Sequence, residues 1–134
     1  MIPSTAGILA ADFDIKEQAS KTYKMDWDNK VIKGSCDGVE AVKQAIFKII
    51  NTERYQYIMY SWNYGVELLD LYGQPITYVC PELERRISEA LSADARIISV
   101  TDFEHDITQK GKVHTKFIVH TIFGDVQSEK EVNI

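Results

Sequence analysis

The C-terminal stretch 126–134 alternates between two classes of side chain, and this pattern constrains the fold more than any other. One face would carry Val126, Ser128, Lys130, Val132 and Ile134, and the other Asp125, Gln127, Glu129, Glu131 and Asn133. Successive side chains of a β-strand point to opposite faces, so the pattern predicts a half-exposed strand. We expect its outer edge to be open and able to pair with another chain. The predicted docking edge consists of Val126, Gln127, Ser128, Glu129, Lys130, Glu131 and Val132.

Two further runs with β-strand character precede this strand, at 96–107 and 113–123. The second run is rich in β-branched and aromatic residues, with Val113, Phe117, Val119 and Phe123 on one face, which is typical of a central strand. Turn residues at 108–111 and at Gly124–Asp125 separate the runs. Short connections of this kind favour an antiparallel meander in which each strand pairs with its neighbour in sequence.

The first of these strands contains a conflict of phase. Ile98 and Val100 share one face, whereas Phe103 falls on the other. One extra residue at Thr101–Asp102 would return Phe103 to the buried face, so the sequence predicts a β-bulge there.

The first half of the chain predicts an N-terminal hairpin and three helical segments. The hairpin comprises 21–32, with its turn at 28–30. The first helix begins at Asp37, which with Glu40 fits a capping box, and ends near Asn51. A short helical piece is expected at 66–72, and a third helix is expected to begin at Pro81. The predicted fold is therefore α+β, with three helical segments packed on a C-terminal antiparallel β-meander.

Length and charge limit the possible classes of protein. A chain of 134 residues has room for one domain, which we assign to 20–134 after an irregular N-terminal arm at 1–19. A net charge of -5 and a pI near 5.2 argue against nucleic acid or an anionic membrane as the main partner. No apolar run is long enough to cross a membrane. Cys36 and Cys80 are distant in sequence and are expected to be reduced, packing thiols.

Two clusters could be taken for catalytic or metal sites. Aromatic residues at 55–64 lie near Glu53, Glu67 and Asp70 and could line a saccharide groove, but alternate aromatic residues usually pack, and acidic residues at helix starts usually cap. His105 and His114 would face each other across the hairpin if no bulge intervened, but two imidazoles rarely form a metal site. We therefore expect no catalytic residue, no metal and no cofactor.

Asp94-Ala95-Arg96 lies where the third helix stops and the meander begins. An arginine held between two rigid elements can offer a two-pronged contact to a partner. The alternative is a local Asp94–Arg96 salt bridge that closes the corner, and the pattern leaves both interpretations open. We assign Asp94 and Arg96 as candidate partner-binding residues.

Several segments together resemble the contractile-tail sheath initiator family, a group of baseplate wedge proteins historically labelled lysozyme-like. Lys24-Met25-Asp26-Trp27 resembles the family's N-terminal segment, 38–52 its first helix, and Tyr64-Gly65 its aromatic-glycine turn. The stretch 82–91 resembles the helix that leads to the family's Glu-Pro-Arg motif, which here falls on Asp94, Ala95 and Arg96. Of that motif, arginine alone is unchanged, and alanine lacks the fixed φ of proline. The sequence at 51–54 and 61–65 is most similar to the branch of the family found in Gram-positive prophages and bacteriocin-like particles.

The resemblance implies a structural baseplate protein, with no enzymatic activity, that links the wedge to the first sheath ring and templates sheath assembly. It implies that Asp94 and Arg96 meet the wedge's helical core and that the terminal strand meets the sheath. Implied partners are the sheath protein, the baseplate wedge proteins and inner-tube or hub proteins, with six copies in each particle. Implied locations are the host cytoplasm during assembly and then the baseplate of the released particle. The alternatives are a tail-associated peptidoglycan hydrolase and a free-standing regulatory binding domain.

Overall fold

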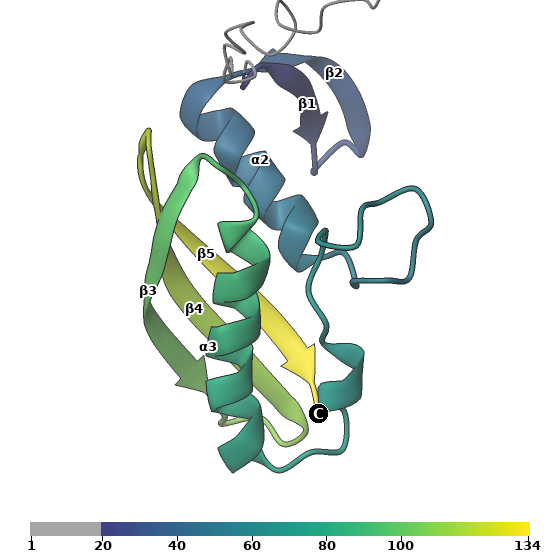
Figure 1. Cartoon of the computed structure of the whole chain (residues 1–134), viewed down its shortest axis with the longest axis vertical. Coiled ribbons are helices and arrows are strands. Elements are labelled where there is room, and N and C mark those ends of the chain that lie inside the picture. Colours follow the sequence, from purple (N-terminus) through teal and green to yellow (C-terminus); the bar gives the residue numbers. More distant parts are fainter. Residues whose placement is uncertain (1–19) are drawn as a thin grey trace, which may run out of the picture.

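The computed structural model describes residues 20–134, so the arm predicted for 1–19 lies outside the described residues. Within this range the chain is α+β, with two sheets and two α-helices (Figure 1). β1 (Thr22–Asp26) and β2 (Val31–Cys36) form the predicted hairpin, and α2 (Gly38–Ile50) follows. A 3-10 turn, η1 (Leu69–Leu71), precedes α3 (Ile76–Ser92). The chain then forms β3 (Ile97–Asp106), β4 (Lys112–Thr121) and β5 (Gly124–Asn133).

The three C-terminal strands form the predicted antiparallel meander in the order β3-β4-β5. β4 and β5 pair without interruption from Lys112–Asn133 to Thr121–Gly124. The turn between them is formed by Ile122 and Phe123, not by Gly124–Asp125 as predicted. Phe123 therefore lies on the exposed hairpin tip, and Thr121 takes the last buried position of β4. Gly124 has a φ of 120°, which glycine adopts easily, and it is the first residue of β5 after the turn.

The predicted bulge in β3 is confirmed. Thr101 pairs with Ile118 and Glu104 with Lys116, so Asp102 and Phe103 together oppose the single residue Phe117. Asp102 has a φ of 57°, the left-handed conformation that such a bulge uses. The extra residue turns Phe103 towards the core, where its ring centroid lies 5.5 Å from that of Phe117.

The helices differ from prediction in three respects. The segment 66–72 contains only the 3-10 turn η1, so the expectation of three helical segments is met in part. α3 begins at Ile76 rather than Pro81, because burial of Val79 in the core favours the earlier start and the helix accommodates Pro81 internally. The capping box does not form, since the Asp37 carboxylate accepts from the Gly38 N–H and Glu40 contacts Lys43 instead.

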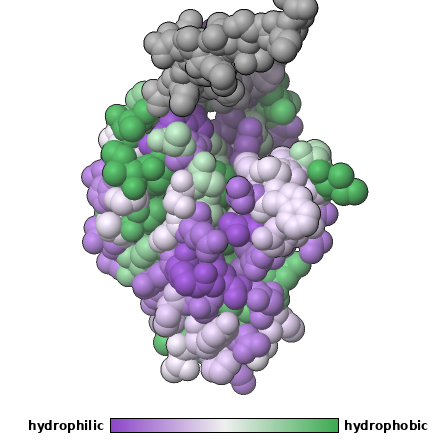
Figure 2. Space-filling view, viewed as in Figure 1, coloured by the Kyte–Doolittle hydropathy of each residue, from purple (hydrophilic) through white to green (hydrophobic). Residues whose placement is uncertain are grey.

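The core lies on one face of the β3-β4-β5 sheet. α3 covers this face in Figure 1, and α2 lies above α3 in that view and contacts both α3 and β5. The charged outer side of α3 forms the hydrophilic centre of Figure 2. Fully buried side chains from both helices and from β4 meet here: Val42, Ile46, Val79, Leu83, Ile87, Leu91, Val113, Phe117 and Val119. Neither helix is long and apolar enough to cross a membrane.

One buried amide fixes the N-terminal hairpin to α2. Gln44 donates from Nε2 to the Tyr23 carbonyl at 2.7 Å and accepts from the Met25 N–H at 2.8 Å. These two backbone groups flank the point where the β1–β2 register shifts, so the side chain replaces hydrogen bonds that the irregular ladder lacks. The hairpin is thereby held beside the N-terminal part of α2.

A close backbone contact closes the loop between α2 and η1. Val66 donates to the Thr52 carbonyl at 3.0 Å, and Arg54 donates to the Val66 carbonyl at 3.2 Å. Gly65, the residue before Val66, has a φ of 93°. A Cβ at Gly65 would lie 2.5 Å from the Thr52 carbonyl oxygen. The loop projects to the right in Figure 1. Its residues Ile58, Met59 and Trp62 are highly exposed.

The contact at Gly65 generates the first prediction. Gly65→Ala should lower the free energy of unfolding by about 3 kcal/mol, because it adds a clash with fixed backbone to an unfavourable φ. Gly73→Ala is the matched control, since Gly73 also has a positive φ but its Cβ would meet nothing within 4 Å. It should cost about 1 kcal/mol. Urea denaturation of both variants measures the difference, and equal losses would contradict the close-approach argument.

Candidate docking site along the edge strand

The orientation of the β5 backbone follows from one hydrogen bond at its end. Ile134 donates its N–H to the Gly111 carbonyl, which places the N–H of this residue on the β4 side. Backbone groups of an antiparallel strand alternate between its two sides. Ser128 and the other even-numbered residues therefore point their N–H groups at β4, whereas Gln127, Glu129 and Glu131 point theirs outward. Within residues 20–134, no strand pairs with this outer side.

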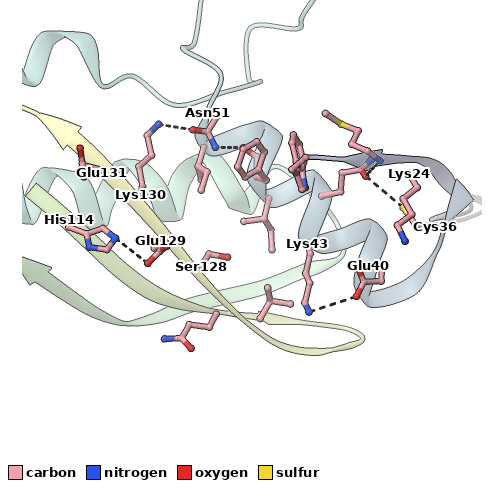
Figure 3. A pocket seen from close by; sticks show the side chains of 18 residues that line it. Lys24, Cys36, Glu40, Lys43, Asn51, His114, Ser128, Glu129, Lys130 and Glu131 are labelled. Atoms are coloured by element: carbon pink, nitrogen blue, oxygen red, sulfur yellow. Dashed lines mark hydrogen bonds and ion pairs between the residues drawn. The ribbon is translucent and has the colours of Figure 1, made fainter. Parts of the chain in front are cut away.

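A groove runs beside the outer edge of β5. It has a volume of about 790 Å³ and is bounded by β5, α2 and the β1–β2 hairpin (Figure 3). Trp27 and Phe47 contribute exposed aromatic rings whose centroids lie 4.1 Å apart. Both faces of β5 reach the groove, since Ser128 and Lys130 line it together with Glu129 and Glu131. The predicted edge residues Val126 to Lys130 thus border a space large enough for an extended segment.

A second groove continues along the C-terminal half of β5. It has a volume of about 590 Å³ and is lined by Val132, Asn133 and residues of the 50–72 segment. Lys130 marks the boundary, because its Nζ donates to Asn51 Oδ1 at 2.9 Å and both residues line both grooves. Burial lowers the pKa of Lys130, while the nearby Glu53 charge opposes that shift. All seven predicted edge residues therefore lie along one continuous border.

The second candidate site is the corner between α3 and β3. Arg96 donates from Nε and Nη2 to Asp94 Oδ1 and Oδ2 at 3.0 and 2.7 Å, and its backbone N–H also donates to Oδ1. Both side chains are about one-fifth exposed or less. The hydrogen bond from Arg96 holds the pKa of Asp94 below its usual range despite partial burial. The local Asp94–Arg96 salt bridge therefore forms, and its three hydrogen bonds fix the two residues relative to each other. Contact of this pair with a partner stays a prediction.

Folding brings this corner close to the aromatic-glycine turn. Burial raises the pKa of Tyr64, with smaller contributions from Tyr60 and from the charge of Asp94. Tyr60 and Tyr64 stack with ring centroids 4.5 Å apart. The linear pattern presents Tyr64-Gly65 and Asp94-Arg96 as separate motifs, because residue spacing does not show that two segments thirty residues apart will lie near each other.

The carboxylates of the possible saccharide groove are engaged elsewhere. Glu53 accepts hydrogen bonds from the N–H groups of Leu68 and Leu69, and so caps η1. Asp70 forms an ion pair with Arg86. The expectation that acidic residues here cap or solvate local structure therefore holds for Glu53, and Asp70 serves as an ion-pair partner.

His105 and His114 do not face each other, because the β3–β4 register pairs His105 with Thr115 and His114 with Asp106. The two rings lie on opposite faces of the sheet. His105 contacts Glu84 of α3, and His114 contacts Glu129 of β5. Across residues 20–134, no three metal-binding side chains converge.

Comparisons with known proteins give a consistent result. The sequence profile described as contractile injection system sheath initiator matches residues 19–124. The chain is also 38% identical over 119 residues to the phage-like element PBSX protein XkdS of Bacillus subtilis (strain 168). That alignment covers 86% of this chain and 84% of the relative. The family profile thus covers the hairpin, both helices, β3 and β4, and it ends where β5 begins.

The Asp94–Arg96 geometry generates the second prediction. Arg96→Ala should reduce the free energy of unfolding at pH 7 by about 1 to 2 kcal/mol, because a largely buried, doubly hydrogen-bonded pair is lost. The folded-state pKa of Asp94 is depressed, so the contribution of the pair is complete above about pH 4 and is lost as the pH falls through the folded-state pKa. The wild type and the variant should therefore converge in stability in acid. Arg85→Ala, at an exposed arginine of α3, is the control and should change little.

Proposed function

Because the chain belongs to the contractile injection system sheath initiator family, we propose that it joins the baseplate wedge to the first sheath ring and templates sheath assembly. A structural role related to the tail sheath is the part that family membership itself supplies. The further step, from sheath-related protein to template, is supported by the edge of β5. Its outward N–H groups border two grooves with space for an extended arm.

The proposed mechanism is strand addition. An extended arm of a sheath subunit would pair with β5 through backbone hydrogen bonds, which supply affinity without requiring a particular sequence. Side chains on one face of the arm would enter the groove between β5 and α2, and this fixes register, since a shift by one residue would reverse the two faces. Six copies around the tail would then impose the spacing of the first ring on every ring that follows.

The Asp94–Arg96 corner is the proposed contact with the wedge. It is rigid because the backbone N–H of Ile97 also donates to the Asp94 carbonyl at 3.1 Å. In the described chain, the hydrogen bonds to Asp94 use Nε and Nη2 of Arg96, which leaves Nη1 available for a partner. Asp94 and Arg96 lie at the α3–β3 junction and the docking edge on β5, so the two proposed partners would approach different parts of the domain.

In this proposal the protein acts without catalysis, and its other contacts in the baseplate would include inner-tube or hub proteins. It would be present in the host cytoplasm during assembly and in the baseplate of the finished particle. Neither Glu53 nor Asp70 is given a chemical role, because each carboxylate already serves a local structural contact.

Proline substitutions along β5 provide the third prediction. Gln127→Pro and Glu129→Pro remove outward N–H groups, so the domain should fold with a loss of about 1 kcal/mol while sheath polymerisation fails. Ser128→Pro is the matched control, because it removes an N–H that faces β4 and should cost about 3 kcal/mol or more. Gln127→Ser should be tolerated. Thermal unfolding and electron microscopy of particles measure the two effects.

The expected particles have baseplates with bare tubes or no tails. Full-length sheath on particles that carry folded Gln127→Pro and Glu129→Pro proteins would contradict templating by β5 and would direct the search to another surface.

The fourth prediction concerns the wedge contact. Arg96→Ala should keep the domain folded yet prevent its incorporation into baseplates, as measured by mass spectrometry of purified particles. Arg96→Lys should also impair incorporation, since an ammonium cannot make the two-pronged contact with Asp94 and keep a third nitrogen free for the wedge. Normal incorporation of both variants would restrict Arg96 to the local salt bridge.

A further inference from the structure

The exposed face of the three-stranded sheet alternates in charge from strand to strand. On β3, Glu104 and Asp106 lie opposite Lys116 and His114 of β4. The charges of His114 and Lys116 contribute to lowering the pKa of Asp106, after the hydrogen bonds that it accepts from Thr108. On this face, β3 therefore presents acidic side chains to the basic side chains of the central strand, β4.

β5 repeats the acidic pattern on the other side of β4. Glu131 lies 3.1 Å from Lys112, Glu129 lies 3.1 Å from His114, and Asp125 lies 2.6 Å from His120. These acidic side chains are more than half exposed. They have basic neighbours on the β4 side, and within residues 20–134 no strand lies on their other side.

The opposite face of β5 meets different chemistry. On that face, Val126 and Ser128 line the groove whose wall includes the exposed Trp27–Phe47 pair. An added strand would alternate in the same phase as β5, so its residues opposite Val126 and Ser128 would enter the groove. Those opposite Asp125, Glu129 and Glu131 would lie on the acidic face.

We propose that the strand which pairs with β5 carries apolar side chains on its groove face and lysine or arginine on its exposed face. This inference rests on the proposed docking function and specifies the chemistry of the arm. The added strand would extend the alternation of charge to a fourth strand, because cross-strand pairs of opposite charge stabilise a sheet and like charges destabilise it. The acidic row of β5 thus selects among arms that all could form the same backbone hydrogen bonds.

The test uses the full-length protein and three ten-residue synthetic peptides with blocked termini. All three have valine at alternate positions, and the positions between them are lysine, threonine or glutamate. Amide hydrogen exchange and NMR titration of the protein report where each peptide binds and how tightly. The lysine peptide should protect the outward amides of Gln127, Glu129 and Glu131 and bind about tenfold more tightly than the threonine peptide at low salt. The glutamate peptide should bind weakest, and added salt should reduce the differences.

A pair of double variants isolates the acidic row. Glu129→Gln with Glu131→Gln should abolish the preference for lysine while keeping the threonine peptide bound. Glu104→Gln with Asp106→Asn removes the same charge from the β3 edge of the same face and should leave the preference intact. This control separates the local row from the overall negative charge of the protein.

The outcomes separate the charge preference from strand addition itself. Equal affinity of the three peptides at the β5 edge would overturn the charge preference and leave strand addition standing. The charge preference would also be overturned if the Glu104→Gln/Asp106→Asn control lost the preference for lysine and the Glu129→Gln/Glu131→Gln variant kept it. Failure of all three peptides to protect the outward β5 amides would overturn docking at this edge and, with it, the proposed arm.

Discussion

The whole domain depends on a core that occupies only one face of its three-stranded sheet. Phe117, Val113 and Val119 of β4 point into the space beneath α3, and Val126 and Val132 of β5 extend that apolar surface towards α2. Burial on one face leaves the other face to water, where acidic and basic side chains pair across the strands. It also fixes the register of β5, because a shift by one residue would expose the two valines. The proposed docking edge therefore has a single register before any partner binds.

The candidate site arises from elements that are distant in sequence. β5 supplies outward backbone groups, but the wall that turns its edge into a groove comes from α2 and the N-terminal hairpin. Gln44 holds that hairpin in place through two backbone hydrogen bonds at an irregular point of its ladder. The Lys130–Asn51 hydrogen bond then connects β5 to the end of α2. The proposed template would need a fixed wall as well as a free edge, since the wall determines which face of an incoming strand is buried.

The two proposed contact sites differ in whether their polar groups already have partners within the domain. Arg96 already satisfies Asp94, so a wedge protein would meet a preformed pair and lose little side-chain entropy on binding. The outward N–H groups of β5 have no strand beside them in the described chain, so binding there gains new hydrogen bonds. Family membership accounts for a sheath-related role, and these two sites are our proposal for how that role is divided across one small domain.

The sequence by itself determined the features that depend on local periodicity: the meander, the buried face of β5, the N-terminal hairpin, and the bulge that returns Phe103 to the core. It failed where packing overrode local preference. α3 extends back to Ile76 because Val79 is buried in the core, and 66–72 forms only a 3-10 turn. The tertiary structure alone decided the grooves beside β5, the position of Tyr64 near the charge of Asp94, and the separation of His105 from His114. Each of these features depends on contacts between distant segments or on the exact register of paired strands. The spacing of residues along the chain predicts neither the contacts nor the register.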